Sequence, residues 1–212
     1  MLRYDRRTRR LAAILAGAAG FVDAMGFIAM NGFFVSFMSG NSTRLGVGLT
    51  SNWTWAAVAG GLIGAFLAGV VAGSVAGRLA RPDRRRVYVL CLVSLLLLAA
   101  PVASSIGWST VALALMAAAM GAENAVFERD GEVAIGLTYM TGTLVKLGQR
   151  LADGMMGGDV RAAAPYLVHW LGLVGGAVAG AALYPHLGLR GVWLAAVVVL
   201  ACAIWDALSE RA

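Results

Sequence analysis

Charged residues and metal ligands are scarce in this chain of 212 residues. Asp, Glu, Lys and Arg make up 13% of the sequence, about half the share that is usual in a soluble domain. The two cysteines and two histidines are scattered, which argues against a metal site and a disulfide framework. Because no phosphate-binding loop and no Ser, His and Asp set is recognisable, we expect neither enzyme activity nor a cofactor.

Apolar residues are in large excess. They make up 60% of the chain, the mean hydropathy is +0.78, and 28 residues are glycine. One small core cannot hide this excess, because a folded chain of this size still exposes much of its surface. The composition therefore excludes a soluble enzyme and predicts a helical integral membrane protein.

Six apolar runs are long enough to cross a bilayer, at about 20 residues per crossing: 11–30, 54–79, 87–106, 108–127, 162–184 and 191–208. The first follows the basic start MLRYDRRTRR, contains Asp23 and is longer than a signal peptide requires, so we interpret it as a spanning helix. Two less hydrophobic segments, 33–50 and 133–151, are rich in Gly, Ser and Thr.

The distribution of arginine distinguishes two topologies. If all eight segments cross and the N-terminus is cytoplasmic, eight arginines lie inside and seven outside. If the two weak segments return to the side they left, fourteen lie inside and only Arg190 lies outside. Short cytoplasmic loops carry an excess of Arg and Lys. We therefore predict an all-α polytopic protein with six transmembrane helices, two re-entrant or broken helices, and both termini in the cytoplasm.

The weak segments also match each other. SFMSGNSTRLG at 36–46 matches TYMTGTLVKLG at 138–148 with an offset of 102 residues. Flanking matches occur between 20–24 and 121–125, and between 68–73 and 175–180, with offsets of 101 and 107. We interpret them as a duplication within a single membrane domain, 1–212, with repeats at about 11–106 and 108–208. Three crossings per repeat place the second copy upside down, which predicts two inverted repeats.

Three of these motifs carry a family resemblance. GFVDAMGF at 20–27, FVSFMSGNSTRLG at 34–46 and TYMTGTLVKLG at 138–148 are similar to the YoaK-like bacterial membrane proteins, a family of unknown function designated DUF1275. The resemblance covers nearly the whole chain. It implies a multi-pass protein of the bacterial inner (plasma) membrane, but no substrate.

Two cations occupy equivalent places in the repeats. Arg44 follows Gly40 by four residues, and Lys146 follows Gly142 by four. A cation at membrane depth costs at least ~2.5–3.5 kcal/mol, so it normally faces protein, water or a partner. Three interpretations stay open: the cations flank a shared anion site, they pair with Asp23 and Glu123 to stabilise the bundle, or they reach the membrane surface.

The residues around these cations complete a candidate site. Each motif combines a chain-breaking Gly with residues suited to a helix start, whose free N–H groups and positive dipole end favour an anion. The alternative is a kinked helix whose hydroxyls bond to its own carbonyls. The predicted substrate-binding residues are Arg44, Lys146, Ser39, Asn41, Ser42, Thr141 and Thr143, and the predicted proton or charge partners are Asp23, Glu123 and Asn124.

Two classes of function fit this sequence. The leading hypothesis is a transporter or channel for a small anionic molecule, with a site at the membrane midplane between the repeats. The competing one is a non-transporting scaffold or partner subunit whose buried charges only stabilise the bundle. Glycines at every fourth position of 54–79 and 162–184 predict close helix packing, within the chain or in a homo-oligomer. The expected partners are the lipid bilayer and a small solute, and not nucleic acid, because the arginines flank apolar runs.

Overall fold

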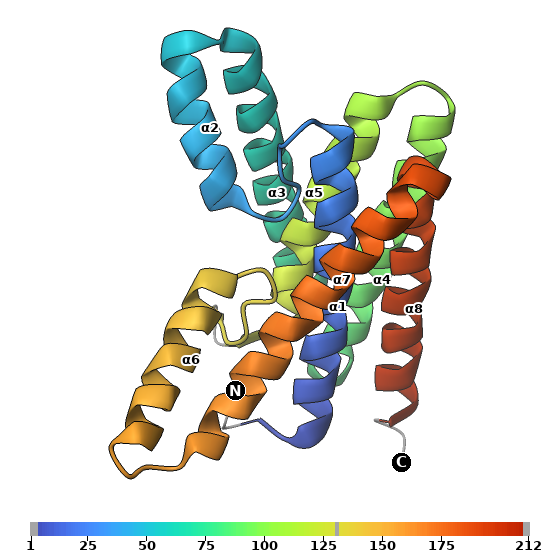
Figure 1. Ribbon diagram of the computed structural model, residues 1–212. Coiled ribbons are helices and arrows are strands. Elements are labelled where there is room, and N and C mark those ends of the chain that lie inside the picture. The colour runs from blue at the N-terminus through green and yellow to red at the C-terminus, as the bar shows by residue number, and fades with distance from the viewer. Residues whose placement is uncertain (1–3, 130–131, 210–212) are drawn as a thin grey trace.

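The computed structural model describes residues 4–129 and 132–209 (Figure 1). These residues form eight α-helices: α1 (Arg6–Ala29), α2 (Met38–Ser51), α3 (Trp53–Leu79), α4 (Arg85–Ser105), α5 (Ser109–Glu123), α6 (Met140–Met155), α7 (Ala164–Leu187) and α8 (Val192–Ser209). Short 3-10 turns connect some of them: η1 (Pro82–Arg84), η2 (Asn124–Phe127), η3 (Val160–Ala163) and η4 (Gly188–Gly191). Two strands of two residues each, β1 (Glu128–Arg129) and β2 (Glu132–Val133), pair antiparallel.

Five stretches are long and apolar enough to cross a membrane: Arg6–Ala29, Trp53–Leu79, Pro82–Ser105, Ser109–Phe127 and Val160–Ser209. The last contains both α7 and α8. A multi-pass helical membrane protein is thereby confirmed, and the six apolar runs of the sequence coincide with α1, α3, α4, α5 with η2, α7 and α8. Helices α2 and α6 have 14 and 16 residues. Their lengths of about 21 and 24 Å fall short of the ~30 Å hydrocarbon core.

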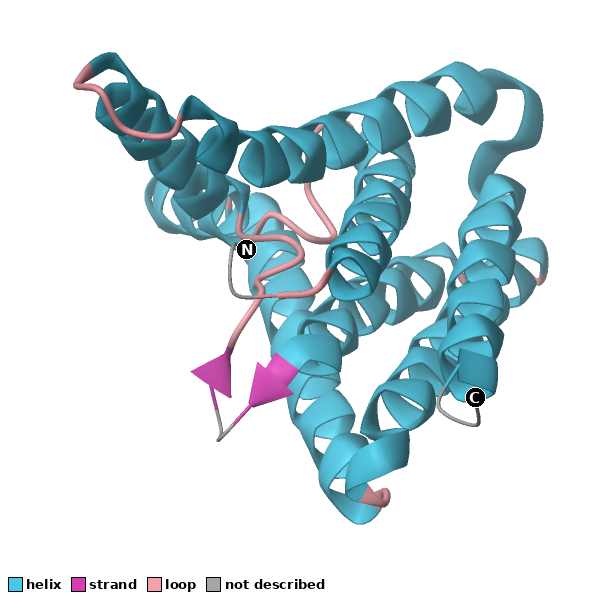
Figure 2. Cartoon of the chain, turned by 90° about the horizontal axis from the view of Figure 1, so that it is seen from below, coloured by secondary structure: helices cyan, strands magenta, loops and turns pink. Residues whose placement is uncertain are grey.

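Helices α2 and α6 leave the middle of the molecule in opposite directions. The chain climbs along α1 to the upper end, returns to mid-height, and climbs again along α2 (Figure 1). After α5 it passes through η2 and the two short strands and then descends along α6 (Figure 1). The loops before these helices lie near each other in the centre, as the view from below also shows (Figure 2). Helix α2 thus ends towards the upper end of the molecule and α6 towards its lower end (Figure 1).

Glycine allows two helix pairs to pack with their backbones in contact. A Cβ added at Gly20 of α1 would lie 2.9 Å from the carbonyl carbon of Leu173 of α7. A Cβ added at Gly121 of α5 would lie 2.9 Å from the carbonyl carbon of Phe66 of α3. Gly121 follows Gly20 by 101 residues and Leu173 follows Phe66 by 107, so the two contacts join equivalent positions of the repeats.

A second pair of contacts repeats this correspondence. Gly176 of α7 faces the backbone of Gly17 on α1, and Gly69 of α3 faces that of Ala118 on α5. Here too the two contacts join equivalent positions: Gly176 follows Gly69 by 107 residues, and Ala118 follows Gly17 by 101. At these positions the glycine-rich faces of α3 and α7 are thus used for packing inside the chain, whereas an added Cβ at Gly61 or Gly175 would meet no atom within 4 Å.

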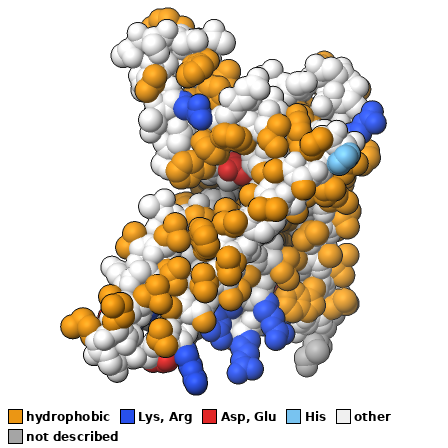
Figure 3. All heavy atoms as spheres, viewed as in Figure 1, with side chains coloured by type: hydrophobic (Ala, Val, Ile, Leu, Met, Phe, Trp, Pro, Cys, Tyr) orange, Lys and Arg blue, Asp and Glu red, His pale blue; other side chains and the backbone are white. Residues whose placement is uncertain are grey.

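The outer surface is apolar between its two ends. Large hydrophobic side chains are exposed on several helices, including Leu67, Leu95, Val178 and Val197. Figure 3 shows hydrophobic side chains over the flank of the molecule, while most of the basic side chains on this face gather at its lower end. The core beneath consists of fully buried side chains such as Leu15, Leu97 and Met116. This distribution suits a molecule whose flank contacts lipid.

Candidate functional site

Asp23 of α1 holds the loop between α1 and α2. Its Oδ1 accepts hydrogen bonds from the backbone N–H groups of Val35, at 2.8 Å, and Ser36, at 2.7 Å. The buried side chain of Asn41 bonds the same loop twice, accepting from the Phe34 N–H at 3.1 Å and donating to the Phe34 carbonyl at 2.6 Å. A non-helical backbone inside a membrane needs such internal partners. These two side chains therefore set where α2 begins.

Asn124 and Thr138 make the equivalent tether in the second half. The Asn124 amide donates to the Thr138 hydroxyl at 3.2 Å and to the Met120 carbonyl at 2.9 Å, and both side chains are buried. Asn124 follows Asp23 by 101 residues, and Thr138 follows Ser36 by 102. The same positions thus fix the loop before each short helix, although the bonds are chemically different.

A cavity of about 340 Å³ separates the starts of α2 and α6. Nine of its ten lining residues come from the two matching motifs or lie immediately beside them, and Phe66 of α3 completes it: Ser36, Phe37, Met38, Ser39, Phe66, Thr138, Tyr139, Met140, Thr141 and Gly142. Four hydroxyl-bearing Ser and Thr residues line it, and none of the lining residues is charged. Two of the predicted substrate-binding residues, Ser39 and Thr141, are therefore brought together here.

The two predicted cations do not lie at this cavity. Arg44 stacks on Phe33 and Phe34, with its guanidinium carbon 5.1 and 5.7 Å from the ring centroids, and lines a separate cavity of about 380 Å³. Lys146 is exposed on α6. Each lies six residues after its helix start, about 9 Å along the axis. Since α2 and α6 run in opposite directions, this distance moves the two cations apart. The prediction that Arg44 and Lys146 flank one shared anion site is therefore corrected.

The alternative pairing with acids is not formed either. Among the described residues, Arg44 makes no ion pair with Asp23, and Lys146 makes none with Glu123. Asp23 bonds backbone instead. Glu123 is fully buried at the end of α5, and neither of its carboxylate oxygens accepts a hydrogen bond from a described group. The prediction that Asp23 or Glu123 carries a coupling proton stays untested.

The remaining polar candidates bond within their own helices. The Ser42 hydroxyl donates to the Met38 carbonyl at 2.8 Å, and the Thr143 hydroxyl donates to the Tyr139 carbonyl at 3.3 Å. Neither residue lines the cavity, and Asn41 serves the loop. Sequence reasoning missed Ser36, Thr138 and Phe66. The first two could have been found, because they open the matching motifs.

A cluster of ion pairs ties the helices together at the lower end. Arg85 of α4 forms an ion pair with Glu128 at 2.9 Å, Arg78 of α3 approaches the same carboxylate at 3.5 Å, and the Ser74 hydroxyl donates to it at 2.7 Å. Burial alone would raise the pKa of Glu128, but the Ser74 hydrogen bond and the two guanidinium groups outweigh it, so the pKa lies below its usual value. A second cluster joins Asp206 of α8 to Arg7 at 3.0 Å and Arg86 at 3.9 Å.

No group of three or more His, Cys, Asp or Glu side chains suited to a metal ion occurs in the part of the chain that the structure describes. His169, which is buried in α7, makes no hydrogen bond through either ring nitrogen to a described group.

Comparisons with known proteins place the chain in a family. The model of a protein family of unknown function, DUF1275, matches residues 11–205. The chain is 36% identical over 196 residues to the UPF0700 transmembrane protein RA0705 of Rhizobium meliloti (strain 1021), which covers 91% of this chain and 84% of that protein. No solved structure matches this chain. The chain belongs to the DUF1275 family of membrane proteins.

Proposed function

We propose that this protein is a transporter or channel for a small anionic solute, which binds in the cavity between the starts of α2 and α6. One observation carries this proposal: the two halves of the chain contribute equivalent residues, Ser36 with Thr138 and Ser39 with Thr141, to a single cavity. Residues that serve only to hold the bundle together would have no reason to line one shared cavity from equivalent positions of both halves.

The helix starts favour an anion over a cation. The first N–H groups of a helix have no partner within it, and they carry the positive end of the helix dipole. No side chain caps α2 or α6, whose first residues are Met38 and Met140. Two uncapped helix starts at one cavity, with four Ser and Thr hydroxyl groups and no acid in its lining, suit a small anion.

The arrangement of the helices supports two inverted repeats, with six crossings and two re-entrant helices. The packing of α1 on α7 matches that of α3 on α5 through equivalent residues, and α2 and α6 end on opposite sides. The arginine-rich starts of α1 and α4 lie at the lower end, where α8 also ends (Figure 1). We infer that this end faces the cytoplasm of a bacterial cell and that the protein is inserted in the inner membrane.

The charge preference of the cavity can be measured with thiol reagents. Single cysteines at Ser39 or Thr141, in a chain with Cys91→Ser and Cys202→Ala, would be reacted with an anionic and a cationic methanethiosulfonate of similar size. We expect the anionic reagent to react at least tenfold faster at both positions. Ser42→Cys is the matched control, because Ser42 lies on the same helix but outside the cavity, and it should show no such preference. Equal rates at Ser39 and Thr141, or a preference for the cation, would contradict an anion site.

Transport itself would be measured in proteoliposomes by the efflux of chloride, nitrate, formate or lactate. We expect efflux of at least one of these anions, reduced at least tenfold in Ser39→Ala/Thr141→Ala and unchanged in Ser42→Ala. If the folded protein releases none of the four and the thiol reagents show no preference, the scaffold function is the better explanation.

A further inference from the structure

A basic groove lies at the lower end, where α1 and α7 begin side by side. It has a volume of about 390 Å³ and is lined by four arginines and four small or apolar residues: Arg6, Arg9, Arg10, Arg161, Ala13, Ala164, Pro165 and Val168. Three of the arginines come from the first two turns of α1, and the fourth comes from η3, just before α7. The charged residues are outermost, while Ala13 and Val168 lie farther along their helices.

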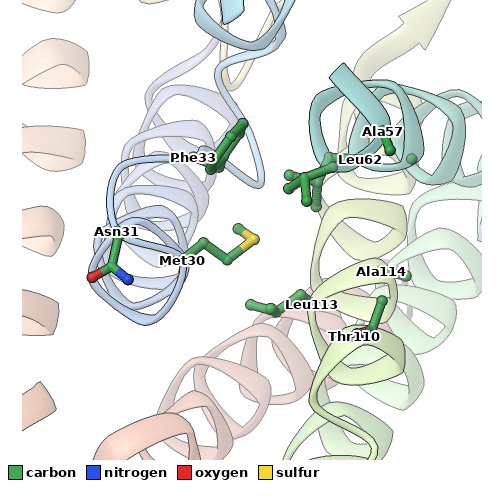
Figure 4. Close-up of a pocket in the computed structure, with 10 residues that line it drawn as sticks. Met30, Asn31, Phe33, Ala57, Leu62, Thr110, Leu113 and Ala114 are labelled. Carbon is green, nitrogen blue, oxygen red and sulfur yellow. The ribbon is translucent and has the colours of Figure 1, made fainter. Parts of the chain in front are cut away.

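The other half of the molecule has an uncharged counterpart to this groove. It is a cavity of about 470 Å³ between α3, α5 and the loop after α1, where Met30, Phe33, Leu62 and Leu113 point toward one another (Figure 4). Five of its positions match the groove. With the offset of 107 residues, Ala57, Val58 and Gly61 of the cavity correspond to Ala164, Pro165 and Val168 of the groove. With the offset of 101 residues, Thr110 and Ala114 of the cavity correspond to Arg9 and Ala13 of the groove.

The two sites therefore occupy the same place beside equivalent helix pairs and differ in charge. No charged residue lines the uncharged cavity, and Thr110 stands there where the groove has Arg9. Both surfaces would meet lipid near a membrane face, because they lie at the starts of spanning helices. The basic groove alone can neutralise a headgroup, and it lies at the end where the other arginines gather (Figure 3).

The arginines of the groove are available to an external anion. None of the four forms an ion pair with an acid in the described ranges. The nearest acids in sequence, Asp5 and Asp159, each accept a backbone hydrogen bond from their own turn, from Thr8 and Arg161 respectively. A guanidinium group presents paired donors that fit the oxygens of a phosphate.

We propose that this groove binds one anionic phospholipid of the cytoplasmic leaflet. The headgroup phosphate lies between Arg9 and Arg161, with Arg6 and Arg10 at its edge, and an acyl chain follows Ala13, Pro165 and Val168 into the bilayer. A lipid explains both parts of the groove, whereas a free phosphate would use only the arginines. This inference does not depend on the proposed transport function.

Binding can be measured by native mass spectrometry of the protein in detergent, titrated with phosphatidylglycerol, phosphatidylcholine or inorganic phosphate. We expect phosphatidylglycerol to bind at least tenfold more tightly than phosphatidylcholine. Arg9→Gln/Arg161→Gln should weaken that binding at least fivefold. Arg81→Gln/Arg84→Gln is the matched control, because it removes two exposed arginines from the connection between α3 and α4, outside the groove, and it should change binding less than twofold.

Val168→Trp tests the apolar part of the groove while leaving every arginine in place. We expect it to weaken phosphatidylglycerol binding at least threefold, a test that stands even if the double arginine variant does not fold. Three outcomes would overturn the proposal: equal binding of both lipids, an equal loss in the Arg81/Arg84 control, or displacement of the lipid by millimolar inorganic phosphate with no effect of Val168→Trp.

Discussion

Asp23 and Asn124 occupy equivalent positions and hold equivalent loops with different chemistry. The carboxylate of Asp23 accepts two backbone N–H bonds, while the amide of Asn124 bonds the Thr138 hydroxyl. An isolated carboxylate at membrane depth would be costly, but the two N–H groups satisfy Asp23. Its position within an apolar run is thereby explained without an ion pair to Arg44.

Glu128 predicts how the stability of the protein depends on pH. Its pKa in the folded protein lies below the usual value of 4.5, so its stabilising effect is present above that value and is lost as the pH falls through the lower, folded-state pKa. Glu128→Gln should lower the free energy of unfolding at pH 7 by about 1.5–3 kcal/mol, the usual range for a charged hydrogen bond. Thermal unfolding in detergent at pH 7 and at pH 3 would measure this.

The difference between the wild type and Glu128→Gln should be smaller at pH 3 than at pH 7, because the stabilising effect of the charge is lost as the pH falls towards the lowered pKa of the folded state. Glu132→Gln is the control, since Glu132 is an exposed acid in the paired strand and should change little at either pH. A difference between wild type and Glu128→Gln that is the same at pH 7 and pH 3 would show that the charge of Glu128 is not what stabilises the lower end.

The packing of α1 on α7 depends on individual glycines, and two neighbouring glycines of α7 differ in whether they face α1. Gly176 faces the backbone of Gly17 across the α1–α7 contact, whereas an added Cβ at Gly175 would meet no atom within 4 Å. We expect Gly176→Val to cost at least about 1–3 kcal/mol, because the two backbones cannot both stay in place. Thermal unfolding and the yield of monodisperse protein would measure the loss.

Gly175→Val is the matched control, since both changes add the same side chain to the middle of α7. It should unfold near the wild-type temperature. Equal effects of the two substitutions would mean that helix propensity, and not close packing of α1 on α7, determines the role of these glycines.

The spanning helices could be predicted because hydropathy is a local property, and the starts of α2 and α6 could be predicted because the motifs repeat. The positions of Arg44 and Lys146 could not. They depend on the direction in which each short helix leaves the central loop, and no local pattern encodes that direction. The same holds for Phe66 in the cavity and for the partners of Glu128 on α3 and α4, which are brought close only by helix packing.

At the scale of the whole molecule, the two halves match in their contacts but not in their charges. Equivalent glycines join α1 to α7 and α3 to α5, and equivalent loops lead into α2 and α6. Most of the basic side chains on the face that Figure 3 shows, by contrast, gather at one end. If the two halves are inverted repeats, the excess of arginine at one end would hold the protein in a single orientation in the membrane. The shared cavity would then lie near the middle of the bilayer.

The side on which α2 ends is the most direct test of this arrangement. Thr50 and Gln149 are exposed near the ends of α2 and α6, whereas Gly48 is unsuitable because an added Cβ would lie 2.6 Å from the backbone nitrogen of Ala56. Single cysteines at Thr50 and Gln149 would be labelled with an impermeant thiol reagent from each side, in a chain with Cys91→Ser and Cys202→Ala. Cysteines at the exposed residues Ser109 and Asp83 are added as references: Ser109 lies outside and Asp83 in the cytoplasm in the inverted arrangement, whereas eight complete crossings would exchange their sides.

We predict that Thr50→Cys reacts only from the outside, like Ser109→Cys, and that Gln149→Cys reacts only from the cytoplasm, like Asp83→Cys. Labelling of Thr50→Cys from the cytoplasm, as eight complete crossings would require, would contradict the inverted arrangement and the shared site that depends on it.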